Sequence, residues 1–219
     1  PGVISGLKVC VAFLERHDID YTTDYSDGDT IDSPLIISLK GRAHDILATE
    51  RLLLNILSHL SGISTHTNNI VKIAKEANPN VEILATRKTL PGLRDLEKEA
   101  VVHGGGQTHR MRLDDAILIK DNHLKLSKSI KESITLSRTK YPDLMLEVEA
   151  DNEEQALEIA ECGADRVMLD NFTPLDAAKT IKKLRQFSNI EIEISGGVTI
   201  ENVAEYAKNT DFISLGSLT

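Results

Sequence analysis

Short apolar runs recur through the last two thirds of the chain, and each has the length of a β-strand. Segments with the apolar spacing of an amphipathic helix separate most of these runs. Alternation of strand and helix patterns with short connections is typical of a parallel sheet. The pattern predicts strands at 81–84, 116–119, 144–148, 166–169, 190–194 and 212–215, and helices at 127–139, 153–161, 174–185 and 200–208.

Two architectures accommodate these strands. One is an open doubly wound sheet with helices on both faces. The other is a (β/α) barrel, complete or incomplete, with its helices outside. The periodicity of the sequence does not separate the two.

The first part of the chain has a different pattern. It predicts a helix at 7–16, strands at 21–25 and 34–40 around a turn at 26–29, and a long helix at 43–77. Gly62 is expected to kink or interrupt that helix. We therefore predict a partial N-terminal α/β domain with long connecting helices over residues 1–78, and an α/β-barrel domain over residues 79–219.

Composition narrows the class of partner. The net charge is −9, aromatic residues make up 4% and Trp is absent, which argues against nucleic-acid binding. Cys10 and Cys162 form no CxxC motif and are expected to be reduced. No apolar run has transmembrane length and no signal peptide is visible, so we expect a cytoplasmic protein without a membrane partner.

One segment departs from the acidic average. Residues 87–128 hold nine Lys or Arg against six Asp or Glu. A locally cationic segment in an acidic protein suggests a small anionic ligand held in a pocket, although a solvated surface run has the same composition. The positions of the charges must decide between the two.

Polar residues follow the predicted strands. In βα barrels the reacting groups lie on loops at the carboxyl ends of the strands. Here every predicted strand ends in charge or in a glycine turn, which favours a site over a solvated rim. These ends are 86–89, 120–123, Glu147 with Glu149, Asp170 with Asn171, 195–197 and 216–217.

Two strand ends suit a phosphate group. Ser195, Gly196 and Gly197, with Thr199 opening the next helix, offer backbone N–H groups and a helix N-terminus to an anion. Gly216 ends the neighbouring strand, and late barrel loops often form phosphate sites together. Plain glycine turns are the alternative.

The cations at 87–88 and 109–110 flank the glycines 104–106. The adjacent cations Arg87-Lys88 and His109-Arg110 repel each other, and an anion with several carboxylate oxygens would neutralise them. Pairing with Asp114, Asp115 or Glu97 is the alternative. Gly104 to Gly106 form either a flexible connection or a close backbone approach to a ligand.

Carboxylates at neighbouring strand ends suit ribose hydroxyls or Mg²⁺. Glu149 and Asp170 are the candidates. Val148 is expected to point inward, and Glu149 is preferred over Glu147 because it lies nearer the strand end. No histidine cluster with the character of a transition-metal site is expected. Walker A, GxGxxG and GxSxG motifs are absent.

Several of these stretches resemble one enzyme family in order and in detail. ATRKTLPGLR at 85–94, GGGQTHR at 104–110 and IKDNH at 119–123 are similar to the signature of quinolinate phosphoribosyltransferases. Glu50-Arg51 with Asn55, SGIST at 61–65, LDN at 169–171 and SGG at 195–197 match as well. The resemblance extends over essentially the whole chain.

The resemblance implies a fold and an activity. The fold is an incomplete (β/α) barrel of mostly parallel strands with a smaller N-terminal α/β domain, which we expect to be truncated here. The activity is phosphoribosyl transfer from phosphoribosyl pyrophosphate to quinolinate with decarboxylation, a step of NAD biosynthesis, carried out by a homodimer or higher oligomer with Mg²⁺. Ala85 and Arg112 depart from the family pattern and leave the details of the pocket open.

The resemblance also assigns roles to residues. It implies Lys120, Glu149 and Asp170 as catalytic, with Glu149 and Asp170 also holding the metal. Arg51 would act across the dimer interface. The substrate cations would be Arg51, Arg87, Lys88, His109, Arg110 and Lys120, and the 5′-phosphate would lie at Ser195, Gly196, Gly197 and Gly216.

Three alternatives stay open. The first is nicotinate phosphoribosyltransferase of the same superfamily. The second is a sugar-phosphate lyase or isomerase on a barrel, which explains the phosphate turn and the carboxylates but not the arginines. The third is a non-catalytic sensor of phosphoribosyl or carboxylate ligands.

Overall fold

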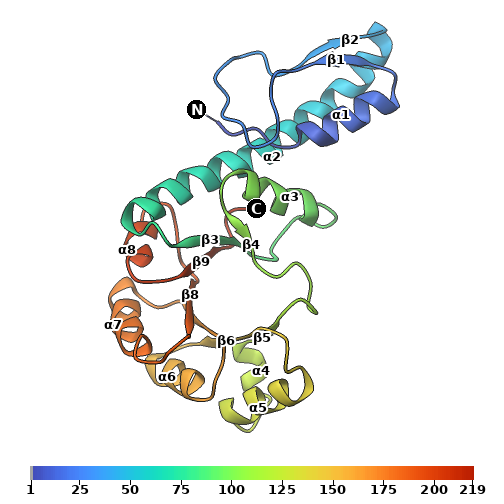
Figure 1. The fold of residues 1–219 in the computed structure, drawn as a ribbon. Helices are drawn as coiled ribbons and strands as arrows, with labels where there is room; N and C mark the ends of the chain where they lie inside the picture. The colour runs from blue at the N-terminus through green and yellow to red at the C-terminus, as the bar shows by residue number, and fades with distance from the viewer. Residues whose placement is uncertain (1) are drawn as a thin grey trace. The chain divides into compact units, whose positions relative to one another are not determined.

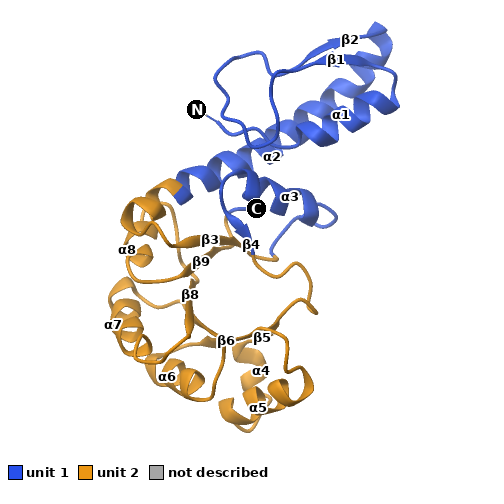
Figure 2. Ribbon diagram, viewed as in Figure 1, with its two compact units in different colours: residues 1–71, 88–108, 218–219 blue, residues 72–87, 109–217 orange. Residues whose placement is uncertain are grey.

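A computed structural model describes residues 2–219 of the chain (Figure 1). The chain divides into two compact units, which Figure 2 distinguishes by colour. The first unit comprises residues 1–71, 88–108 and 218–219, and the second comprises residues 72–87 and 109–217. The domain boundary expected between residues 78 and 79 stays a prediction.

The first unit is built on two helices. They are α1 (Leu7–Arg16) and most of α2 (Ala43–Ala77), and a small antiparallel sheet of β1 (Asp20–Thr22) and β2 (Ser38–Lys40) accompanies them. Cys10 and Leu14 of α1 share a buried cluster with Ile19 and with Leu53 of α2. Asp27, in the predicted turn, accepts hydrogen bonds from the first N–H groups of α1, which have no partner inside the helix. The unit also contains α3 (Arg94–His103) and β4 (Gln107–Thr108).

Helix α2 is continuous over 35 residues. The helix runs through Gly62 without a break, so the expected interruption is wrong. A Cβ added at Gly62 would meet nothing within 4 Å, and the glycine therefore serves no close contact among the described residues. Among residues 2–219, no helix is both long enough and apolar enough to cross a membrane.

The second unit is a curved parallel sheet. Along the sheet, the strands follow the order β3-β9-β8-β7-β6-β5, and every neighbouring pair in this order is parallel. The helices lie on the outside of the curve (Figure 1), which is the arrangement of a barrel and not of a doubly wound sheet. The strands are β3 (Glu82–Ala85), β5 (Ile117–Ile119), β6 (Leu146–Ala150), β7 (Arg166–Asp170), β8 (Glu191–Ser195) and β9 (Phe212–Leu215), and the helices are α4 (Asp121–Leu124), α5 (Ile130–Lys140), α6 (Glu153–Glu161), α7 (Pro174–Leu184) and α8 (Val203–Ala207).

The register of the sheet sorts its side chains into two sets. Val148 pairs with Val167, which pairs with Ile192, and these side chains are fully buried on the side of the helices. The alternate positions carry Glu147, Arg166 and Glu191 side by side. Since successive side chains of a strand point to opposite faces, the inner face of the curve is charged.

Some elements differ from the sequence pattern for local reasons. Helix α5 begins at Ile130 because the hydroxyl of Ser129 accepts the N–H of Glu132 and caps it. Helix α3 was not predicted, because its buried face includes the charged residues Glu97 and Lys98. The short helix α4 was not predicted either. Helix α8 covers only five residues, and residues 200–202 form a turn before it.

Candidate functional site

Most of the predicted site residues lie at one end of the curved sheet in the second unit. Lys120 directly follows β5, Asp170 is the last residue of β7 and Ser195 is the last residue of β8. Arg87 lies two residues beyond β3, and Gly216 directly follows β9. The carboxyl ends of parallel strands meet at one edge, so the topology brings these positions together. Arg51 and Lys88 belong to the first unit, where both are exposed.

Lys120 and Glu149 form a direct ion pair across β5 and β6. The Nζ atom of Lys120 lies 3.0 Å from Oε2 of Glu149. Glu149 is buried whereas the lysine side chain is 47% exposed, so the cation faces solvent over a buried anion. The backbone N–H of Lys120 donates to Nδ1 of His123, which fixes the start of α4 at this point. The lysine is therefore held at the rim but remains accessible to a ligand.

Arg87 and Arg110 place two positive charges near each other. Burial lowers the pKa of Arg110, and the charge of Arg87 lowers it further, while Glu147 and Asp115 act in the opposite direction. Asp115 uses one oxygen to accept the backbone N–H groups of Met111 and Arg112. A ligand with carboxylate groups would relieve the repulsion between the two arginines.

Glu97, one of the carboxylates weighed as a partner of these cations, has partners within the first unit. Its carboxylate lies inside the first unit, 2.8 Å from Nε2 of His59, and accepts the backbone N–H of Leu90.

Gly104 serves packing, because an added Cβ would lie 2.7 Å from Cβ of Thr67 and would collide with the carbonyl oxygen of Ser64. This glycine lets α3 end close to α2.

A buried cluster of one histidine and two carboxylates lies on the inner face of the sheet. Nε2 of His109 is 3.0 Å from Oε2 of Glu147 on β6 and 3.3 Å from Oε2 of Glu193 on β8. Nδ1 of the same ring accepts the backbone N–H of Arg110 at 2.8 Å. Both carboxylates are at most 1% exposed. A cluster around His109 was not predicted, and the expectation that no transition-metal site is present stays a prediction.

Glu147 and Glu193 were not predicted as members of this cluster, and Val148 was expected on the inner face. Val148 is buried on the helix side, and Glu147 and Glu149 share the inner face because they are two residues apart. The alternation of Glu with Val in β6, and of Glu with Ile in β8, was the available signal.

Proton affinities within the cluster are shifted. Burial lowers the pKa of His109, but hydrogen bonds and charge from Glu147 and Glu193 outweigh it and raise the pKa to about 9. Burial and the charge of Glu193 raise the pKa of Glu147 to about 7. The cluster therefore keeps one extra proton near neutral pH. The raised pKa of His109 by itself favours a charged ring, but Nδ1 already accepts the N–H of Arg110, so we place the extra proton on Glu147.

Arg166 extends the charged set toward the start of the strands. Its guanidinium lies 2.8 Å from Glu191 and 3.2 Å from Glu193, and its Cζ atom lies 3.8 Å from the centroid of the Phe212 ring. The arginine therefore balances the buried charge of Glu193 and has little freedom to move.

The glycine turn after β8 has the backbone geometry of an anion site. Gly196 and Gly197 both have positive φ, at 81° and 65°. A Cβ at Gly196 would collide with the side chain of Asn171. Successive N–H groups in such a turn form a concave site for a phosphate. The expectation that Thr199 opens a helix is wrong, because α8 begins at Val203, and the turn alone offers its N–H groups.

Glu149 and Asp170 offer the oxygen donors that Mg²⁺ prefers, with Glu149 already paired with Lys120. They lie on adjacent parallel strands, on the same inner face, near the carboxyl ends. Two carboxylates and open solvent suit Mg²⁺, which retains several waters and takes further oxygens from a substrate. The pair therefore fits this ion by its donor atoms.

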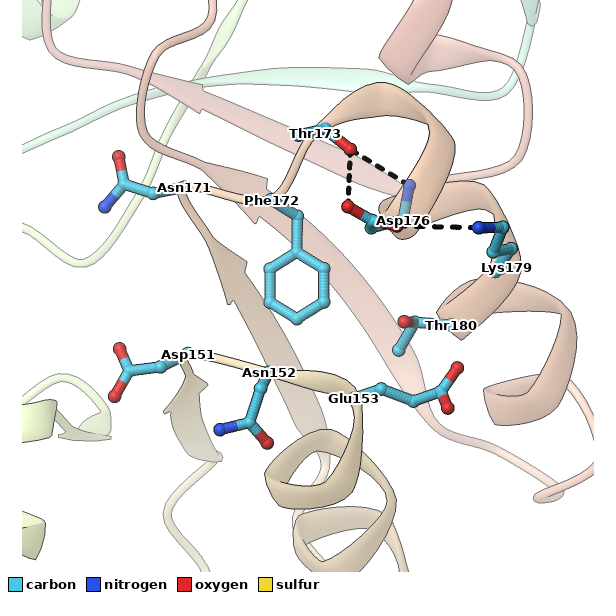
Figure 3. Close-up of a pocket in the computed structure, with 9 residues that line it drawn as sticks. All are labelled: Asp151, Asn152, Glu153, Asn171, Phe172, Thr173, Asp176, Lys179 and Thr180. Carbon is cyan, nitrogen blue, oxygen red and sulfur yellow. Dashed lines mark hydrogen bonds and ion pairs between the residues drawn. The ribbon is translucent and has the colours of Figure 1, made fainter.

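A separate cavity of about 460 Å³ lies near the ends of β6 and β7 (Figure 3). Figure 3 shows that Thr173, Asp176 and Lys179 on its wall interact with one another. Asn171, at the end of β7, is on its wall, but no residue that was assigned a role lines this cavity, and its hydrogen bonds cap α7. We assign it no ligand.

Comparison with known families gives two matches that follow each other along the chain. A model of the quinolinate phosphoribosyl transferase N-terminal domain matches residues 1–61. A model of the C-terminal domain of the same family matches residues 63–219.

Individual proteins agree with the family models. The chain is 44% identical over 99% of its length to a protein of Methanocaldococcus jannaschii named as a probable nicotinate-nucleotide pyrophosphorylase (carboxylating), and covers 78% of it. It is 35% identical over its full length to the rat nicotinate-nucleotide pyrophosphorylase (carboxylating), and covers 75% of it. The crystal structure of NadC from Streptococcus pyogenes superposes with a TM-score of 0.92 at 34% identity, over the full chain and 78% of that structure.

Proposed function

The chain belongs to the quinolinate phosphoribosyltransferase family, and from this premise we propose that it converts quinolinate and phosphoribosyl pyrophosphate to nicotinate mononucleotide, pyrophosphate and CO₂. The observation that carries the proposal is the proximity of Arg87 and Arg110, together with Lys120 and the glycine turn at 195–197, which follow strands of the same sheet. Cytoplasmic location is part of the same proposal.

Quinolinate needs cations because it carries two neighbouring ring carboxylates. Arg87 and Arg110 repel each other unless an anion lies between them, and Lys120 is exposed at the rim. Hydrogen bonds from charged donors to carboxylates contribute about 1.5–3 kcal/mol each. A ligand with one carboxylate would leave part of this positive charge without a partner, which favours quinolinate over nicotinate.

The other substrate has a phosphate, a ribose and a pyrophosphate to be held. The Ser195-Gly196-Gly197 turn and Gly216 would bind the 5′-phosphate through backbone N–H groups. Glu149 and Asp170 would hold Mg²⁺ and the ribose hydroxyls. When bound, Mg²⁺ would neutralise charge on the departing pyrophosphate.

The transfer step breaks the bond from C1′ to the pyrophosphate oxygen and forms a bond from C1′ to the pyridine nitrogen. Positive charge develops at C1′ in the transition state, where the carboxylates of Glu149 and Asp170 would stabilise it. The arginines would hold the ring so that its nitrogen faces C1′, which lowers the entropy cost of the encounter.

Decarboxylation follows from the product of the first step. The alkylated ring nitrogen is positively charged and stabilises the electron pair left at C2 when CO₂ departs. C2 must then accept a proton. We assign Lys120 to this step. Its ammonium group can stabilise the carboxylate, and it is exposed to solvent, from which a proton can come.

We further propose a homodimer in which Arg51 serves the neighbouring subunit. Arg51 is exposed on α2 of the first unit, where it is available to a partner. A mixing experiment tests this: Arg51→Ala and Lys120→Ala are each expected to be inactive alone and to regain activity when mixed. Absence of recovery in a verified mixed dimer would contradict an arginine that acts in trans.

The activity itself has a direct test. Purified protein is incubated with quinolinate, phosphoribosyl pyrophosphate and Mg²⁺, and nicotinate mononucleotide and CO₂ are measured. Nicotinate replaces quinolinate in a parallel reaction. Turnover of nicotinate without turnover of quinolinate would overturn the proposal in favour of the nicotinate-using enzymes, and binding without product would favour a sensor.

A further inference from the structure

Both ring nitrogens of His109 are engaged within the protein. Nδ1 accepts the backbone N–H of Arg110, and Nε2 lies against the carboxylates of Glu147 and Glu193. The side chain is only 9% exposed. A ring held in this way offers no nitrogen to a substrate. Its position between the sheet and the Arg110 backbone suits a residue that fixes a neighbour in place.

The carboxylates that hold the ring are themselves fixed. Glu147 and Glu193 stand on β6 and β8, on either side of β7, and their register in the sheet is set by backbone hydrogen bonds. Glu193 also contacts Arg166, which is locked between Glu191 and the Phe212 ring. A support built on strands holds a side chain more firmly than one built on loops.

The residue that receives this support lies on an irregular segment. Residues 109–116 connect β4 to β5 without helix or strand. Within it, the N–H of His109 donates to the carbonyl of Ala85, and Nη1 of Arg110 donates to the carbonyl of Ala116 at 3.4 Å. The backbone N–H of Arg110 donates to Nδ1 of His109, and this hydrogen bond connects the segment to the inner face of the sheet.

We propose that Glu147 and Glu193 are positioning residues that act through His109 to fix Arg110, the arginine that binds a substrate carboxylate. The inference rests on the proposed function for the role of Arg110. It assigns His109 to support and not to direct contact with quinolinate, and it gives the two buried glutamates a purpose that the transfer chemistry does not require.

The test compares isosteric variants of two glutamates on one strand. Glu193→Gln removes a charge that holds His109, whereas Glu191→Gln removes the other partner of Arg166 and leaves the cluster intact. Glu193→Gln should raise KM for quinolinate about tenfold or more, because small misplacements of a binding group are costly. It should leave KM for phosphoribosyl pyrophosphate within about twofold. Glu191→Gln should leave both constants within about twofold.

A second variant protects the test against misfolding. Glu147→Leu, which removes the group in contact with Nε2 of His109, should reproduce the selective rise in KM for quinolinate, with melting temperature recorded for each protein. Equal effects of Glu191→Gln and Glu193→Gln, or equal rises in both KM values, would overturn the proposal and assign the cluster to stability alone.

A double-mutant cycle asks whether the effect passes through Arg110. In an Arg110→Ala background, Glu193→Gln should change KM for quinolinate by less than about twofold, because the residue to be positioned is gone. Additive effects would mean that Glu193 acts by another route.

Nuclear magnetic resonance of ¹⁵N-labelled histidine tests the link without any turnover. The His109 signal, assigned with His109→Gln, should show a proton on Nε2 and none on Nδ1, and Glu193→Gln should remove this preference. If the wild-type protein does not turn over quinolinate, the proposed function fails, while this signature still decides whether His109 supports the Arg110 backbone.

Metal binding is tested in parallel by titration with Mn²⁺ and Zn²⁺, because the possible ligand atoms of His109, Glu147 and Glu193 lie within 4.8 Å of one another. Stoichiometric binding lost in Glu193→Gln would overturn the proposal in favour of a metal site.

Discussion

The two faces of the curved sheet carry opposite chemistry at alternate positions of the same strands. On the helix side, Val148, Val167 and Ile192 are fully buried and apolar. On the inner side, Glu147, Arg166 and Glu193 are ionisable and contact one another or His109. One face of the sheet therefore stabilises the fold, whereas the other face carries the polar groups. A substitution should therefore affect stability or activity according to its face.

The largest effect is expected at the rim of the inner face. Arg110→Ala should lower kcat/KM for quinolinate roughly 100-fold or more, because it removes a charged partner of a bound carboxylate. The free energy of unfolding should change little, since Arg110 is partly exposed and repelled by Arg87. Steady-state kinetics and urea unfolding measure the two quantities. A loss of stability equal to the loss of activity would contradict the division between the faces.

The opposite pattern is expected on the helix side. Ile192→Ala should reduce the free energy of unfolding by about 2–4 kcal/mol, because it leaves a cavity in a fully buried position. The kcat/KM of the folded protein should stay within about threefold of the wild type. Ile192→Val is the matched control, with a loss of about 0.5–1.5 kcal/mol. A selective rise in one KM value would place Ile192 in the site.

An intermediate effect is expected at the glycine turn. Gly196→Ala should cost about 1–3 kcal/mol, because the residue has φ of 81° and the new Cβ would collide with Asn171. KM for phosphoribosyl pyrophosphate should rise more than KM for quinolinate. Gly163→Ala is the control: it also has positive φ, but its added Cβ would meet nothing within 4 Å. Equal changes in both KM values would speak against a phosphate site.

The smallest effect is expected on the outer surface. Lys183 contacts Glu153 at 2.5 Å, but both side chains are well exposed. Lys183→Ala should change the free energy of unfolding by less than about 0.5 kcal/mol and leave kinetics unaltered. A loss above about 1 kcal/mol in urea unfolding would show that ion pairs on the outer surface also stabilise the fold.

Much of the barrel was predictable from the sequence because its strands are short, regular and bounded by turns. Residues 212–215 and 153–161 were predicted with their observed bounds. Helix α3 was not, since Glu97 and Lys98 are buried where an amphipathic pattern expects apolar side chains. Local periodicity cannot reveal a charged residue whose burial depends on distant partners, and Glu97 meets His59 from 38 positions away.

The site was predictable where it follows strand ends and unpredictable where it lies deeper. Lys120, Asp170 and Ser195 could be placed because each ends a strand or follows one. Glu193 could not, because its role depends on His109 and Arg166, which other segments supply. Val148 was expected to face the inside of the curve, which would have put Glu147 on the outer face. The choice between two faces needs the neighbouring strands, and one strand alone does not provide it.

The pairing of β3 with β9 has a consequence for the order in which the protein is made. Glu82 aligns with Phe212, so the parallel partner of β3 leaves the ribosome about 130 residues later. Strands β5 to β8 each meet a neighbour soon after synthesis, whereas the edge of β3 that pairs with β9 must wait for the last strand of the sheet. Contacts between distant residues slow folding, and an unpaired strand edge invites association with other chains. The growing chain should therefore depend on chaperones until residues 212–215 have emerged.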